Sequence, residues 1–139
     1  MNTQRNEKGF TLIELIVVIA IMGIIGAVLV PQFSTMSLRS RMSTDVSSIQ
    51  AAQTQVEVYF NEKGTWPDHA DGNSVISSLV SEDLIDSRYL KTDSTLKLQT
   101  AGASVSYDQT KHRLMVSVTA KDYAKYNKDA DKSVWISEK

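Results

Sequence analysis

The chain has 139 residues, 42% of them hydrophobic, and its 15 Lys and Arg against 16 Asp and Glu give a formal net charge of −1. This balance, without a local cluster of Lys and Arg, argues against the basic face that nucleic-acid binding requires. The absence of cysteine excludes disulfides, thiol nucleophiles and cysteine zinc clusters.

An apolar segment from Phe10 to Val30 contains one charged residue, Glu14. A helix of this length rises roughly 30 Å, which matches the hydrocarbon core of a bilayer. We therefore expect a membrane-spanning helix. Its Ile, Leu, Val and Phe side chains favour insertion by on the order of 6 kcal/mol in total, whereas an acidic side chain costs roughly 2.5 to 3.5 kcal/mol.

Glu14 needs a partner at this depth, because no basic residue lies within a turn or two of it inside the segment. Cleavage between Gly9 and Phe10 would create an α-amino group about one helical turn before Glu14. That cationic amine could then pair with the carboxylate of a neighbouring copy. The polar residues 1–9 carry Arg5 and Lys8, which predicts a cytoplasmic N-terminus and export of the C-terminal part.

The sequence K-G-F-T-L-I-E-L from Lys8 to Leu15 resembles the class III leader junction of the type IV pilin and pseudopilin family. The resemblance implies that residues 1–9 are a prepilin leader, that a membrane peptidase cuts after Gly9 and methylates Phe10, and that Glu14 is required for assembly. An ordinary secretory signal fits less well, because the apolar run is long and no A-x-A-like site precedes Pro31. A plain signal anchor explains neither Gly9-Phe10 nor Glu14.

Three residues are candidates for a break in the helix of residues 10–30 and its continuation. Gly23 and Gly26 each weaken a helix by about 1 kcal/mol relative to Ala, and Pro31 removes a backbone donor. The resemblance implies that the segment from Gly23 to Pro31 loses helicity on assembly, as the corresponding segment does in relatives. Close packing between helices at the glycines, or a simple kink at Pro31, are the alternatives.

Residues 31–63 are expected to continue the helix as an amphipathic stretch that ends before Gly64. Apolar residues recur on one face at spacings of three and four, and polar residues are expected on the other. The apolar set is Met42, Val46, Ile49, Ala52, Val56 and Tyr59, and the polar set is Arg39, Arg41, Asp45, Gln50, Gln53 and Glu57.

Residues 64–139 are expected to form one small globular region. Gly64-Thr65-Trp66-Pro67 resembles a turn of major pilins and pseudopilins that packs on the next subunit, although an aromatic plug over the helix end is the simpler interpretation. A short helix capped by Asn73 or Ser74 should follow. Alternating apolar residues then predict strands. These strands contain Leu96 and Leu98, Ala103 to Tyr107, Leu114 to Val118, and a last one within Ser133 to Ser137, with a hairpin connection from Asp108 to His112.

The predicted fold class is therefore α+β. A long N-terminal helix, half membrane-spanning and half amphipathic, packs against a small antiparallel sheet, which is the lollipop shape that the resemblance implies.

The sequence shows no catalytic constellation, so we expect neither an enzyme nor a cofactor. His69 and His112 are expected to be exposed loop histidines. Some major pseudopilins bind Ca²⁺ near the C-terminus, and Asn127, Asp129 and Asp131 invite that comparison, but three oxygen ligands of undefined geometry favour a solvated loop. The oxygen-rich run Asp68 to Asn73 does not match the Ca²⁺ loop pattern.

The resemblance implies a structural, major pilin-like subunit that forms a helical homo-oligomeric filament. It implies a prepilin peptidase and methyltransferase and a membrane assembly platform as partners, with a single-pass location in the cytoplasmic membrane before assembly and an extracellular or periplasmic filament afterwards. A major pseudopilin of a type II secretion or competence system is one alternative. A single-pass membrane-anchored binding module is another.

Overall fold

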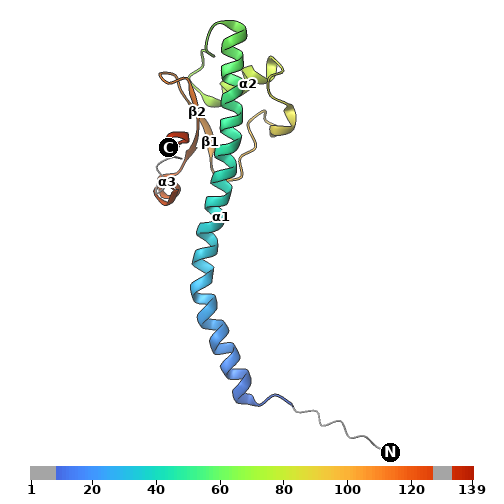
Figure 1. The fold of residues 1–139 in the computed structure, drawn as a ribbon, viewed down its shortest axis with the longest axis vertical. Coiled ribbons are helices and arrows are strands. Elements are labelled where there is room, and N and C mark those ends of the chain that lie inside the picture. Colours follow the sequence, from blue (N-terminus) through green and yellow to red (C-terminus); the bar gives the residue numbers. More distant parts are fainter. Residues whose placement is uncertain (1–8, 127–132) are drawn as a thin grey trace, which may run out of the picture. The chain divides into compact units, whose positions relative to one another are not determined.

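A computed structural model describes residues 9–126 and 133–139. Figure 1 shows a long helix α1 (Leu12–Lys63) followed by helix α2 (Gly72–Ser81), a sheet and a short helix α3 (Ala120–Tyr126). The chain divides into two compact units, one ending at Met36 and the other from Ser37 to Lys139. The division falls inside α1, and each unit is described by itself.

In the first unit α1 is helical without interruption through Gly23, Gly26 and Pro31. The hydroxyls of Ser34 and Thr35 donate to the carbonyl oxygen of Pro31 at 2.9 and 3.2 Å. By length and composition, α1 is the helix in the described part of the chain that is long and apolar enough to cross a membrane.

In the second unit α1 buries one face, which contains Met42, Ile49 and Val56. The expectation that Asp45 and Gln53 lie on the exposed face is wrong, because both side chains are buried. The helical period explains this result: Asp45 precedes Ile49 by one turn, and Gln53 follows it by one turn. The remaining members of the predicted polar set, Arg39, Arg41, Gln50 and Glu57, are exposed.

The sheet has three strands in the order β1 (Ser104–Asp108), β2 (Arg113–Val118) and β3 (Ile136–Glu138). The predicted hairpin is confirmed, since β1 and β2 are antiparallel with Tyr107 opposite Leu114. β3 pairs with β2 in parallel, so the sheet is mixed and the expectation of a wholly antiparallel sheet is wrong. The connection from β2 to β3 contains α3 and is long enough to return the chain for a parallel pairing.

The segment between α1 and β1 differs in detail from expectation. Asp71, rather than Asn73 or Ser74, caps α2 and accepts the backbone N–H of Ser74 at 3.2 Å. A 3₁₀ turn, η1 (Ser87–Tyr89), follows. Leu96 forms an isolated bridge with Leu90 in place of a strand, because a tight turn at Lys91 to Thr95 keeps the pairing short. A 3₁₀ turn, η2 (Ser133–Trp135), precedes β3.

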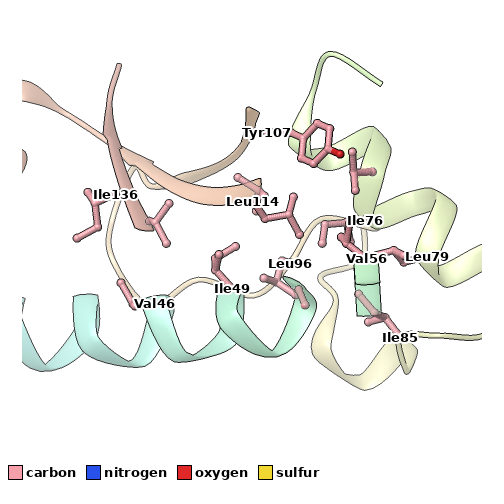
Figure 2. Close-up of a cluster of buried hydrophobic side chains, with 14 of the residues drawn as sticks. Val46, Ile49, Val56, Ile76, Leu79, Ile85, Leu96, Tyr107, Leu114 and Ile136 are labelled. Atoms are coloured by element: carbon pink, nitrogen blue, oxygen red, sulfur yellow. The ribbon is translucent and has the colours of Figure 1, made fainter. Parts of the chain in front are cut away.

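One hydrophobic core joins α1, α2, the loop before β1, and the sheet. Figure 2 shows Val46 and Ile49 of α1 pointing toward the strand residues Leu114 and Ile136, with Ile76 and Leu79 of α2 completing the cluster. Because the core links the second half of α1 to the sheet, the predicted α+β class is confirmed.

Candidate functional site

From Leu12 to Val30 the surface of α1 is apolar except at Glu14. Its large hydrophobic side chains are exposed throughout, from Phe10 at 92% and Leu12 at 75% to Phe33 at 66% and Met36 at 65%. A helix that is apolar all round is stable only when lipid or other chains cover it. Such a surface requires a covering of lipid or of other chains, because the apolar stretch of α1 is not buried by the rest of the described chain.

Glu14 lies in a reciprocal hydrogen-bonded cap at the start of α1. The backbone N–H of Thr11 donates to Glu14 Oε2 at 2.8 Å, and the backbone N–H of Glu14 donates to Thr11 Oγ1 at 3.3 Å. Because the helix begins at Leu12, Thr11 is the N-cap residue and Glu14 is the third helical residue, which is the arrangement of a capping box.

The sequence offers Glu14 no basic partner within its segment, and the capping box gives the carboxylate a neutral hydrogen-bond partner there. It satisfies two backbone N–H groups at a helix end, where several lack an intrahelical acceptor and where lipid offers none. The sequence contained the signal, because Ser or Thr followed three residues later by Glu before an apolar run is typical of this motif.

Gly9 and Phe10 precede the helix and are exposed. The predicted cleavage point therefore lies outside the regular hydrogen-bonding of α1, with Thr11 as the boundary. The remaining leader residues, including Arg5 and Lys8, lie outside the described residues, so the structure does not describe their part of the predicted leader.

Within residues 9–126 and 133–139, the two helix glycines are not crowded by other side chains. Apart from the adjacent residues and the local helix backbone, a Cβ atom placed on Gly23 or Gly26 would meet no atom of these residues within 4 Å. If a larger side chain is disfavoured at either position, the reason must lie in contacts with other molecules or in a change of helix conformation.

The two histidines are half-buried rather than exposed. His69 Nε2 lies 2.7 Å from Ser78 Oγ. The His112 ring stacks on Trp66 with centroids 4.7 Å apart, and Trp66 stacks in turn on Phe60 at 4.3 Å. Trp66 thus packs on its own chain at the end of α1, as the simpler interpretation of the G-T-W-P turn predicted.

The weak Ca²⁺ candidates Asn127, Asp129 and Asp131 lie outside the described residues. Within residues 9–126 and 133–139, no group of three or more His, Asp or Glu side chains is arranged to hold a metal ion. Neither histidine belongs to a metal-binding cluster there.

A long exposed apolar helix that leads into a small α+β unit is a pilin-like fold, and the helix is long and apolar enough to cross a membrane. The model of the family described as the prokaryotic N-terminal methylation motif matches residues 4–30. This match contains the leader junction, Thr11, Glu14 and the apolar run to Val30.

Curated relatives agree with this class. A fimbrial protein of Neisseria meningitidis serogroup B (strain ATCC BAA-335 / MC58) is 35% identical over 92 residues, which cover 66% of this chain and 51% of the relative. The fimbrial protein EcpC of Eikenella corrodens is 43% identical over 61 residues, covering 44% and 40%. The type IV major pilin protein PilA of Myxococcus xanthus (strain DK1622) is 39% identical over 65 residues, covering 47% and 30%.

The chain carries the prokaryotic N-terminal methylation motif at residues 4–30 and is similar in sequence to fimbrial proteins and a type IV major pilin. It spans about half the length of the curated relatives it matches, or less. No solved structure matches the chain.

Proposed function

We propose that the protein is a structural subunit of a type IV pilus filament, held in the membrane by α1 and polymerised after removal of residues 1–9. The exposed apolar helix surface around Glu14, which lies within the methylation motif of residues 4–30, carries this proposal. In a filament core the helices exchange lipid contacts for one another's surfaces. The curated relatives, which are named as fimbrial proteins and type IV major pilins, support a pilus rather than a pseudopilus.

Processing creates the group that Glu14 needs. Hydrolysis of the Gly9–Phe10 peptide bond leaves a free amine on Phe10, and N-methylation keeps that amine basic. We expect the prepilin peptidase and methyltransferase to act on the cytoplasmic side of the membrane, where Arg5 and Lys8 hold the leader. A membrane assembly platform would then receive the processed subunit.

The Glu14 carboxylate pairs with the Phe10 amine of a neighbouring subunit. A buried ion pair gains little net stability, whereas leaving one partner unpaired costs about 3–5 kcal/mol. The pair therefore acts mainly on specificity, because a subunit that docks out of register leaves two charges unpaired. Pairing position 10 of one helix with position 14 of the next displaces the helices axially by roughly 6 Å.

N-terminal sequencing of the membrane-purified protein tests the processing step. A start at methylated Phe10 is expected. An intact Met1 on functional protein would contradict the proposal and favour a membrane-anchored binding module.

Substitution of Glu14 tests the assembly step. Glu14→Ala should be inserted and cleaved normally but should not enter filaments, as seen by electron microscopy of the cell surface. Glu57→Ala is the matched control, because Glu57 is an exposed acidic residue in the second unit of the same helix. Abundant filaments built only from Glu14→Ala would contradict the pairing.

Cysteine cross-linking tests the axial register. In the proposed register, position 13 of one helix lies level with position 17 of the next, and the chain has no cysteine of its own. Mixed expression of Ile13→Cys and Val17→Cys subunits should therefore give a disulfide-linked dimer under mild oxidation, in excess of either variant alone. Equal cross-linking of all combinations would contradict the register.

A further inference from the structure

We propose that Thr11 is a positioning residue, which holds the Glu14 carboxylate in one orientation so that its second oxygen can receive the amine of a neighbouring subunit. This inference rests on the proposed function and concerns how the charge is presented. Thr11 carries the one hydroxyl between Phe10 and Val30.

The geometry divides the two carboxylate oxygens between two tasks. Oε2 accepts the Thr11 N–H at 2.8 Å. Within residues 9–126 and 133–139, Oε1 has no hydrogen-bond partner, and the flanking side chains Ile13, Leu15 and Val17 are apolar and exposed. One oxygen is thus used inside the chain, and a cation approaching from the side meets the other.

The Thr11 hydroxyl acts on this arrangement through the backbone. Thr11 Oγ1 accepts the Glu14 N–H at 3.3 Å and thereby fixes the helix start at Leu12. With that start fixed, the Thr11 N–H points at the carboxylate. In lipid no water can replace a lost acceptor, so the cap is worth more here than on a soluble helix.

A fixed orientation favours pairing because the entropic cost of ordering the long Glu14 side chain is already met before the neighbouring subunit arrives. Glutamate loses considerable rotamer freedom when it is held in one position, and preorganisation of a binding group increases affinity by removing that cost from the association step. Glu14 in the capping box is already ordered by its own chain.

The test uses the full-length protein in membranes, with the Ile13→Cys and Val17→Cys cross-link as readout. Thr11→Val keeps the shape of the side chain but removes the acceptor, and Thr11→Ser keeps the acceptor. We expect Thr11→Val to lower the cross-linked fraction about fivefold, as the loss of an N-cap hydrogen bond of ordinary strength would, and Thr11→Ser to restore it. N-terminal sequencing establishes that each variant is cleaved.

A second background separates positioning from simple support of the helix end. Glu14→Gln keeps an acceptor for the Thr11 N–H but has no charge to present. If Thr11 acts through the charge, Thr11→Val should lower cross-linking only in the Glu14 background. An equal decrease in both backgrounds would show a structural cap alone and overturn the inference.

The inference and the proposed function fail in different ways. If Thr11→Val cross-links like the unsubstituted protein while Glu14→Ala still forms no filaments, the role of Thr11 is wrong and the filament proposal stands. If Glu14→Ala itself forms abundant filaments, the charge pairing on which both depend is wrong.

Discussion

Asp45 and Gln53 are two buried polar side chains of α1 that form hydrogen bonds with backbone groups rather than with other side chains. Asp45 is fully buried and accepts the N–H of Gln99 at 2.6 Å and of Thr100 at 2.8 Å. Gln53 donates to the carbonyl oxygen of His112 and accepts the N–H of Leu114, both at 2.9 Å. Burial of such groups is tolerated because their hydrogen bonds are made.

Asp45→Asn should lower the free energy of unfolding by about 1–3 kcal/mol, because the amide turns an –NH₂ toward one of the two backbone donors. Urea denaturation of the detergent-solubilised protein measures the change. The matched control is Glu57→Gln, an exposed position of α1 where a change within about 0.5 kcal/mol is expected. Equal stability of the two variants would mean that the Asp45 contacts contribute little.

Gly72→Ala should also destabilise the second unit. A Cβ atom on Gly72 would lie 2.7 Å from both the carbonyl carbon and the Cγ1 atom of Val105 in β1. Overpacking costs about 1–3 kcal/mol, which exceeds the roughly 1 kcal/mol that Ala gains over Gly in a helix. Thermal unfolding measures the loss. Ser77→Ala, at an exposed position of α2, should leave the midpoint nearly unchanged.

Among the elements, α1 contains the residues at which a break in the helix is predicted on assembly, Gly23 and Gly26 among them. Gly23→Ala with Gly26→Ala should stabilise the helix by about 1 kcal/mol per site, since neither site is crowded. If assembly requires this stretch to lose helicity, the double variant should insert and be cleaved but yield fewer filaments, counted by electron microscopy. Normal yields would leave the glycines without a conformational role, and lost cross-linking in the membrane would instead indicate close packing between helices.

The long helix and the β1–β2 hairpin could be predicted because each follows from periodicity over many residues. The end of α1 at Lys63 followed from Gly64, which has a φ of 72°. The parallel placement of β3 could not be predicted, since a strand of three residues has no pattern that fixes its direction. The burial of Asp45 and Gln53 could not be predicted from their polarity, because their backbone partners lie more than 50 residues away in the sequence.

The candidate site was predicted by residue type and position, but its geometry was not. Glu14 and Phe10 were identified from the leader motif. The capping box was not predicted, although Thr11 stands three residues before Glu14, because the Thr11 hydroxyl and backbone N–H carry no charge that marks them as partners of a carboxylate. The half-burial of His112 depends on stacking with Trp66, a contact between distant segments that sequence spacing does not reveal.

For the molecule as a whole, the free energy of unfolding should fall at both acid and alkaline pH. Hydrogen bonds from Arg88 lower the pKa of Asp86, so the folded state loses this contribution as pH falls through the lowered value. A hydrogen bond to Glu82 raises the pKa of Lys63, and burial raises the pKa of Tyr107. For these two groups the contribution is complete below the ordinary pKa and is lost as pH rises through the raised one.

Thermal midpoints measured from acid to alkaline pH should therefore show a plateau with a decline at each end. Tyr107→Phe should reduce the alkaline decline while leaving the acid side unchanged. The contributions of the exposed pairs should be small and should weaken in salt. A profile that Tyr107→Phe does not alter would exclude the tyrosine as a cause.

Gln53 holds the β1–β2 turn through hydrogen bonds to the backbone of His112 and Leu114. These hydrogen bonds involve no side chain of the turn, and Gln109, Thr110 and Lys111 are exposed. These three residues can therefore be substituted, or replaced by a grafted peptide, without loss of the Gln53 hydrogen bonds that hold the strands. If the subunits polymerise as proposed, a short epitope inserted there would be displayed once per subunit along a fibre.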